Sequence, residues 1–177
     1  MILLCEKDGH DTILIEERSH TLSRQPGDFC LPGGAVEDGE SPCEAALREC
    51  EEELLISKSA IQVLGALDAV IGARGETVWP FVGRIEGYNG TFSTDETERI
   101  LYVNVEELLA EPDIYTLASP TVPPEDFPYE LIRGGRAYPF GTGKRNVAFY
   151  QTKDAVIWGL TANILHKFMS ALKNDLE

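Results

Sequence analysis

The sequence predicts an α/β sandwich, and three observations support that fold class. Short apolar, β-prone segments recur along the chain, starting with residues 1–6. Two further segments, 41–54 and 155–173, carry apolar residues at helical spacing. A length of 177 residues, 43% of them hydrophobic and 25% charged, suits one domain with a substantial core. Strands with interleaved helices favour an α/β sandwich, and we expect residues 1–177 to form one domain.

The chain is expected to begin with a β-hairpin. Residues 1–6 and 12–17 are apolar and β-prone, and an Asp-Gly pair between them is a hairpin signal. Residues 18–34 are polar and contain several glycines and prolines. They predict a loop with one short strand near 29–31.

The helix expected at 41–54 has a distinct beginning. Ser41 can cap its N-terminus, and Pro42 fits the first helical position, where no N–H is needed. Glu44 stands three residues after the cap, which completes the pattern of a capping box.

The middle of the chain predicts further strands. Residues 61–71 and 77–85 are strand candidates, and Pro80 predicts that the second lies at a sheet edge or is interrupted there. Another strand is expected at 99–105, followed by a short helix at 105–109.

The C-terminal third begins with an irregular segment. Residues 111–145 hold six of the ten prolines, so we expect a long loop that shapes substrate choice. Residues 146–152 alternate like a strand, and Asp154 can cap a final helix at 155–173. Within that helix, Trp158 is expected to pack against the sheet.

The composition limits the kinds of partner. The net charge of −15, from 30 acidic and 15 basic residues, repels nucleic acid and anionic lipid. It also repels phosphorylated small molecules unless a cation lies between them and the protein. No apolar run approaches the length of a membrane span, and no signal peptide is visible, so we expect a cytoplasmic protein. The four cysteines form no CxxC pair, which favours scattered thiols over a zinc site.

An acidic cluster lies on the helix at 41–54. Glu49, Glu52 and Glu53 are three and four residues apart, which places their carboxylates on one helix face. Arg48 adds a cation beside them, and Glu40 lies just before the helix, within reach of Arg48. A solvated acidic face is a common reason for such a run. Repulsion between the carboxylates is also relieved by a hard divalent cation, which binds oxygen ligands.

The spacing around the cluster resembles the Nudix box. That motif reads glycine, five residues, glutamate, seven residues, then arginine-glutamate-aliphatic-x-glutamate-glutamate-x-glycine-aliphatic. The matching positions are Gly34, Glu40, Arg48, Glu49, Glu52, Glu53 and Ile56. Cys50 replaces the first aliphatic residue, and Leu55 replaces the glycine after the helix. The resemblance implies a Nudix-type α/β/α sandwich with a mixed β-sheet.

A second, looser resemblance extends outside the box. Coenzyme A diphosphatases have a similar segment before it and a similar segment near the C-terminus. The matching residues are Arg18, Ser19, Leu22, Gly27, Pro32, Gly33, Gly34 and the run 157–162. Ser23 and Gln25 stand where those proteins usually have arginine and histidine.

The Nudix resemblance implies hydrolysis of a nucleoside diphosphate linked to another moiety. Glu49, Glu52 and Glu53 would then hold Mg²⁺ or Mn²⁺, which offsets the pyrophosphate charge and orients a water. Glu52, Glu53 and Arg48 are the expected catalytic residues. Some family members use a distant glutamate as the base, for which Glu96 and Glu98 are candidates and Glu98 is included in the predicted site.

The substrate remains open at this point. Arg18, Gly33 and Gly34 are the expected cofactor-binding residues: Arg18 can meet phosphates, and the glycine pair lets the backbone pass close to the site, where a carbonyl can be a further ligand. The subgroup resemblance favours coenzyme A or its acyl derivatives as substrate. ADP-ribose, NADH or a nucleotide sugar is the alternative substrate class. The alternative class of function is a regulatory module that binds a nucleotide without hydrolysing it. The expected partner is a small-molecule nucleotide diphosphate, without nucleic acid or membrane, and a homodimer is compatible with the sequence.

Overall fold

A mixed β-sheet lies at the centre of the computed structural model, which describes residues 1–176. Residue 177, the last of the expected domain, lies outside the described residues. The strands of this sheet are β1 (Ile2–Lys7), β2 (His10–Arg18), β3 (Phe29–Cys30), β4 (Ile61–Ala66), β7 (Phe81–Ile85) and β8 (Thr97–Asn104). Their order is β3-β2-β1-β7-β4, with β8 also paired to β2. The β1–β7 pair is parallel and the other pairs are antiparallel.

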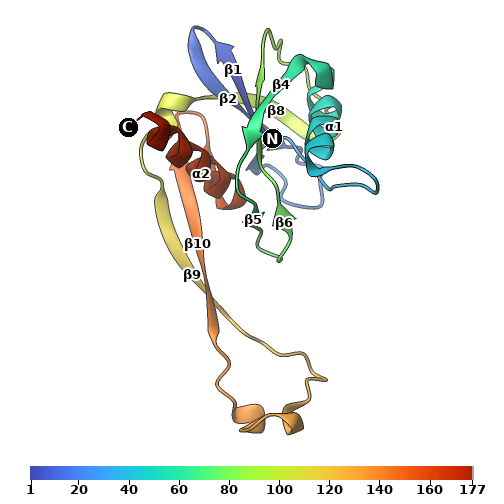
Figure 1. Cartoon of the computed structure of the whole chain (residues 1–177), viewed down its shortest axis with the longest axis vertical. Coiled ribbons are helices and arrows are strands. Elements are labelled where there is room, and N and C mark those ends of the chain that lie inside the picture. Colours follow the sequence, from blue (N-terminus) through green and yellow to red (C-terminus); the bar gives the residue numbers. More distant parts are fainter. Residues whose placement is uncertain (177) are drawn as a thin grey trace.

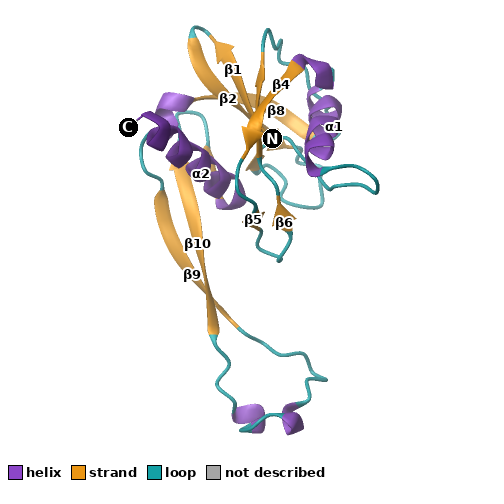
Figure 2. Ribbon diagram, viewed as in Figure 1, coloured by secondary structure: helices purple, strands orange, loops and turns teal. Residues whose placement is uncertain are grey.

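One helix covers each face of this sheet (Figures 1 and 2). Side chains alternate along β1, so that Leu3 packs toward helix α1 (Pro42–Leu54) and Ile2 packs toward helix α2 (Gly159–Leu176). Both side chains are fully buried. The predicted α/β/α sandwich with a mixed sheet is confirmed.

The predicted hairpin at the start of the chain is confirmed, and the strands predicted in the middle of the chain are confirmed in part. The Asp-Gly pair forms the turn of the β1–β2 hairpin, with φ of 52° at Asp8 and 80° at Gly9. Pro80 separates the short strand β6 (Thr77–Val78) from β7. The interruption is therefore correct and the edge position is wrong, because β7 lies between β1 and β4. The strand expected at 61–71 is also divided, since β5 (Val70–Ile71) leaves the main sheet to pair with β6.

The loop predicted at 111–145 is wrong in part. Strands β9 (Asp113–Pro120) and β10 (Thr142–Gln151) form a long antiparallel hairpin, and β11 (Val156–Trp158) pairs with β10. The Ile-Tyr-Thr-Leu run at 114–117 is β-prone, and the prolines of this region lie at or outside the ends of β9. We call residues 113–151 the arm, because they project away from the sandwich (Figure 1).

The start of the final helix is also corrected. The helix predicted at 155–173 begins at Gly159, and Asp154 does not cap it, because 156–158 are paired to β10 as a strand. Gly159 has φ of 68°, a conformation that suits glycine and lets the chain turn from strand into helix. Trp158 does not pack α2 against the sheet as predicted. Its side chain is 45% exposed and stacks on Phe149, with ring centroids 5.9 Å apart.

The short helix expected at 105–109 is present as a 3₁₀ helix at Val105–Leu108. None of the helices within the described residues is long and apolar enough to cross a membrane.

Candidate active site

The beginning of α1 is fixed by the predicted capping box. The backbone N–H of Glu44 donates to the Ser41 hydroxyl at 3.3 Å, and the backbone N–H of Ser41 donates to the Glu44 carboxylate at 2.8 Å. Pro42 occupies the start of the helix, as expected. These contacts satisfy N–H groups that the first helical turn leaves unpaired, and they fix the helix start on which the acidic residues depend.

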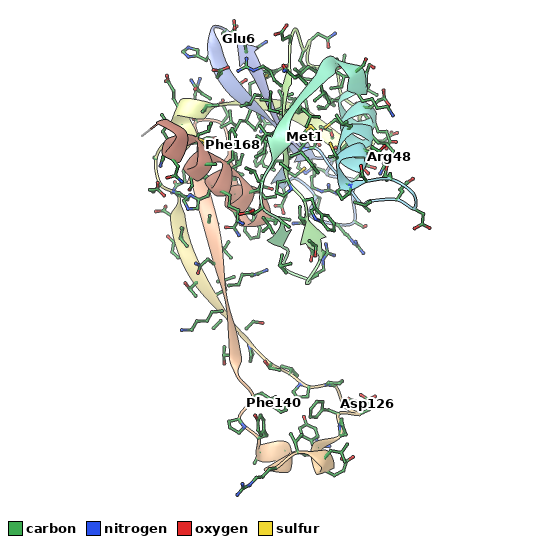
Figure 3. The ribbon with its side chains drawn as sticks, in the orientation of Figure 1. Met1, Glu6, Arg48, Asp126, Phe140 and Phe168 are labelled. Atoms are coloured by element: carbon green, nitrogen blue, oxygen red, sulfur yellow. The ribbon has the colours of Figure 1, made fainter. Side chains whose placement is uncertain are left out.

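Arg48 brings together three of the predicted carboxylates. Its Nη2 lies 2.9 Å from Glu40 Oε1, and its Nη1 lies 2.8 Å from Glu49 Oε1 and 3.3 Å from Glu52 Oε2. Nη2 also donates to the Ala35 carbonyl at 3.0 Å, which ties the loop before the helix to the same guanidinium. The hydrogen bonds from Arg48 hold the pKa of Glu40 below its ordinary value. Arg48 therefore orients Glu49 and Glu52. We call Glu49, Glu52 and Glu53 the acidic face, and Figure 3 labels Arg48 on the helix that carries it.

Glu53 is the buried member of the acidic face. Its residue is 7% exposed, and its Oε2 accepts a hydrogen bond from the Gly33 backbone at 2.9 Å. Burial raises the pKa of Glu53 above the ordinary glutamate value, and the charge of Glu49 adds to that effect. The hydrogen bond from Gly33 opposes the rise. Without a cation, this carboxyl group therefore resists ionisation more than an ordinary glutamate does.

The glycine pair before the helix allows the backbone to approach these carboxylates. Gly33 has φ of 146°, which favours glycine. A Cβ at Gly34 would lie 2.4 Å from Glu49 Oε1, so a side chain there would displace the carboxylate. Both glycines predicted in the site therefore lie against the acidic face, one through a hydrogen bond and the other through close packing.

Glu16 also belongs to this region, although sequence reasoning did not select it. It is 2% exposed, and within the described structure its Oε1 has no hydrogen-bond partner. Burial, followed by the charge of Glu53, raises the pKa of Glu16 to about 8. The available signal was alternation along β2, because Leu14 faces α1 and a residue two positions later faces the same way.

Of the two candidate bases near β8, the structure brings only Glu96 toward the cluster. The charge of Glu96 contributes to the raised pKa of both Glu16 and Glu53. Glu98 is exposed and makes no hydrogen bond or ion pair with another described residue. The structure therefore does not join Glu98 to the predicted site.

Arg18 lies at the end of β2, next to the buried acids. Its Nε donates to the Arg24 carbonyl at 3.3 Å. Burial, then the charges of Glu16 and Glu53, raise the pKa of the Cys30 thiol to about 12, while Arg18 acts in the opposite direction through its charge and a hydrogen bond. The predicted substrate-binding residue Arg18 is thus near Cys30. Cys30 lies on β3, where it is paired with Glu16 of β2.

Leu55 leaves the geometry of the helix end unchanged. Its φ of 53° and ψ of 43° are left-handed, the conformation that a glycine at this position would adopt. The helix stops after Leu54, and the side chain of Leu55 is directed outward with 59% exposure. Glu53 accordingly stays in the last turn, against Gly33.

The chemistry of the donors fits a divalent cation, although their present arrangement is not a coordination sphere. No group of three or more His, Cys, Asp or Glu side chains in the described residues is arranged to hold a metal ion. Glu49 and Glu52 instead face Arg48. The acidic face supplies carboxylate oxygens, and Glu16 supplies a buried oxygen without a partner. Hard cations such as Mg²⁺ prefer oxygen ligands of this kind.

Carboxylates grouped around one arginine, on a capped helix of an α/β/α sandwich, are a donor set suited to an enzyme that binds anionic substrates through a divalent cation. The NUDIX domain model matches residues 1–123, and the chain belongs to the Nudix family. It is a Nudix hydrolase, an enzyme that acts on pyrophosphate bonds.

Comparisons with individual proteins agree with this assignment. The chain is 27% identical over 185 residues to Nudix hydrolase 3 of Caenorhabditis elegans, covering 99% of this chain and 73% of that protein. It is 31% identical over 158 residues to the Nudix hydrolase NudL of Photorhabdus laumondii, covering 88% and 74% respectively. Its fold is similar to that of a crystallised Ap4A hydrolase of C. elegans, with a TM-score of 0.51 and 19% identity over 59% of this chain and 77% of that one.

Proposed function

We propose that this protein hydrolyses the diphosphate bond of coenzyme A or its acyl derivatives, with Mg²⁺ or Mn²⁺ bound at the acidic face. The observation that carries the proposal is the grouping of Glu49 and Glu52 around Arg48, with Arg18 placed near the adjacent buried acids. The choice of coenzyme A rests on the segment that includes Arg18 and Ser19, and on the run at 157–162.

The acidic face would hold the cation through Glu49, Glu52 and Glu53. When bound, a divalent cation neutralises diphosphate charge and lowers the pKa of a bound water. Arg48 positions Glu49 and Glu52, because it donates to both. Glu52 is the most accessible of the Arg48-bound carboxylates, with its side chain 59% exposed, and can accept a proton from water.

The buried acids have a different role. Glu53 and Glu16 both resist ionisation in the absence of a cation, because they are buried and repel each other. A cation at the acidic face favours their charged forms and so couples their ionisation to its own binding. Glu96, whose charge acts on both, is favoured over Glu98 as the additional base.

Arg18 is proposed to contact a substrate phosphate. Its guanidinium offers several N–H donors, and a fork of this shape matches phosphate oxygens. Gly33 and Gly34 are proposed to contribute by keeping the backbone against the acidic face, where a side chain at Gly34 would collide with Glu49.

A substrate panel tests the proposal. Purified protein is incubated with free coenzyme A, acetyl-coenzyme A, ADP-ribose and NADH, each with Mg²⁺, with Mn²⁺ and with EDTA. Products are identified by mass spectrometry. We expect metal-dependent release of 3′,5′-phosphorylated adenosine and a phosphopantetheine. Faster turnover of ADP-ribose or NADH than of coenzyme A would refute the substrate assignment, and nucleotide binding without any turnover would favour a non-catalytic module.

A further inference from the structure

The sheet formed by β9, β10 and β11 has one apolar face that no described element covers. The other face packs on α2 through Ala148, Tyr150 and Ile157, all buried. On the open face, Tyr115 is 58% exposed and Val156 is 51% exposed. These side chains border a hollow of about 570 Å³. Its lining residues are Asp113, Tyr115, Leu117, Val147, Phe149, Gln151, Val156 and Trp158.

This hollow continues toward the segment that precedes the Nudix box. A neighbouring hollow of about 490 Å³ is lined by Gly27, Asp28 and Phe29 together with Phe149, Val156 and Trp158. The last three residues line both hollows, so the two hollows adjoin at these side chains and are described together as one cleft. We call it the outer cleft. The parallel rings of Phe149 and Trp158, inclined by 14°, form its floor where the two parts meet.

The outer cleft is connected to the acidic site through β3 and the end of β2. The Gly27 backbone N–H donates to the Arg18 carbonyl at 3.0 Å, and the Arg18 backbone N–H donates to the Asp28 carbonyl at 2.9 Å. Phe29 lines the cleft, and the next residue, Cys30, is paired with Glu16. Because successive residues of a strand face opposite sides, the cleft and the buried acids lie on the two sides of β3. Because β3 is the edge strand of the sheet, a substrate that reaches both would pass around this edge.

The chemistry of the lining selects one part of such a substrate. Among the described residues that line the outer cleft, the charged ones are Asp28 and Asp113, both acidic. A phosphate in the cleft would meet these like charges, whereas an apolar chain would contact Phe149, Val156 and Trp158. The lining therefore disfavours the 3′-phosphorylated adenosine and favours the opposite, uncharged end of the substrate.

We propose that the outer cleft binds the acyl chain of an acyl-coenzyme A, so that the enzyme selects substrates by chain length. The proposal rests on the proposed diphosphatase function and adds the part of the molecule that determines preference among coenzyme A derivatives. Each buried methylene strengthens binding by up to about fourfold, so a chain that enters the cleft lowers KM in steps.

Kinetics on a homologous series provide the first test. KM and kcat are measured with Mg²⁺ for acetyl-, octanoyl- and dodecanoyl-coenzyme A. We expect KM to fall at least about tenfold from acetyl to dodecanoyl. Trp158→Ala is expected to abolish most of that fall. Tyr115→Asp places a charge in the cleft at an exposed position and is expected to act in the same way, even if the tryptophan variant folds poorly.

The control is Tyr138→Ala, an aromatic residue that is 47% exposed but lies at the far end of the arm, outside the cleft. It should leave the chain-length series unchanged. A flat series in the wild type, or equal losses in the control, would overturn the proposal.

A binding measurement separates failure of this proposal from failure of the proposed function. Dodecanoyl-pantetheine has the acyl chain but no diphosphate, and its binding is followed by tryptophan fluorescence without metal. We expect a change in the wild type that is absent in Trp158→Phe. If hydrolysis is absent but this change is present, the diphosphatase function fails and the acyl site stands. If hydrolysis is present without the fluorescence change, the acyl site fails. Light scattering that shows a dimer lost in Tyr115→Asp, with chain-length preference intact, would assign the face to a second copy and overturn the proposal.

Discussion

The acidic face of α1 and the arm are stabilised by different kinds of contact. The acidic face concentrates like charges and is held together by Arg48, by the Gly33 backbone and by a complete capping box. The arm carries little charge repulsion, yet every residue of β9 is exposed along the projecting hairpin (Figures 1 and 3). One region depends on short-range polar contacts and the other on strand pairing across a long loop.

The two regions are expected to have different roles, one in hydrolysis and the other in the choice of substrate. The polar contacts that fix the carboxylates lie within residues 1–123, the segment that the NUDIX domain model matches. The base of the arm contributes the apolar cleft, which lies outside residues 34–56 and partly beyond the segment matched by the family model. We therefore expect substitutions at the acidic face to change the rate of hydrolysis, and substitutions in the arm to change substrate preference alone.

The largest effect is expected for Glu52→Gln. This change removes an accessible carboxylate proposed to hold the cation and accept a proton, while the amide keeps the shape of the side chain. Turnover should fall by roughly 100-fold or more at saturating Mg²⁺. The matched control is Glu51→Gln on the same helix, whose carboxylate instead accepts from the Lys58 backbone at 3.2 Å. Equal activity in both variants would remove Glu52 from the mechanism.

The helix that carries the acidic face, and its cap, could be predicted because their determinants are close together in the chain. Helical spacing alone places Glu49 and Glu53 together, and the cap that starts the helix is only a few residues away. The arm was predicted poorly because β9 and β10 pair across an intervening segment rich in proline. Glu16 was missed for a related reason, since its burial beside Glu53 depends on how β2 packs against α1. Its pattern in sequence is that of an ordinary acid at the end of an apolar strand.

The next largest effect is expected in the pH dependence of the free energy of unfolding, and it tests Glu16, which the sequence did not single out. The pKa of Glu16 is raised to about 8, mainly by burial, so the native state binds a proton more tightly than the unfolded chain. The associated stability is present below the ordinary glutamate pKa and is lost as pH rises through about 8. In EDTA, we expect Glu16→Gln to reduce that loss by roughly 3 to 4 kcal/mol between pH 5 and pH 8.

Urea unfolding at the two pH values measures this difference. Glu98→Gln, at an exposed position, is the control and should follow the wild-type curve. A wild-type protein whose metal-free stability does not change over this range would contradict the burial of an ionisable Glu16.

A smaller effect distinguishes the two candidate bases. Glu96→Gln is expected to lower kcat by about tenfold, because Glu96 lies close enough to affect the buried acids of the site. Glu98→Gln is expected to leave kcat within about twofold, since the exposed side chain makes no polar contact within the described structure. The reverse ranking would restore Glu98 to the site and would require β8 to shift relative to β2.

Leu55→Gly tests whether the family glycine is needed at the helix end. The backbone of Leu55 is already left-handed, with φ of 53°, and its side chain is mostly exposed. Glycine relieves the steric cost of that conformation, and its greater unfolded-state entropy offsets part of the gain. The free energy of unfolding should rise by about 0.5 kcal/mol, with kcat unchanged. A loss of stability would show that the Leu55 side chain packs in a way that its exposure does not indicate.

The smallest effect is expected at the end of the arm. In residues 121–141, which we call the tip, the aromatic rings pack mainly on one another, as Phe127 does on Phe140 with centroids 5.6 Å apart. Asp126 and Phe140 both lie far from the acidic face (Figure 3). Replacing the tip with a short Gly-Ser turn should therefore shift the thermal midpoint by less than about 2 °C. Turnover of free coenzyme A should stay within about twofold, since neither the acidic face nor the outer cleft is altered.

The same replacement separates the two parts of the arm. If acyl-chain preference survives loss of the tip and disappears in Trp158→Ala, substrate selection lies at the base of the arm, where β10 and β11 meet β3. If the preference disappears with the tip, the hairpin must fold back over the cleft during binding. In that case the shape in Figure 1 is the open form of a moving element. Small-angle scattering with and without dodecanoyl-pantetheine would then show a decrease in the radius of gyration, which a fixed arm would not produce.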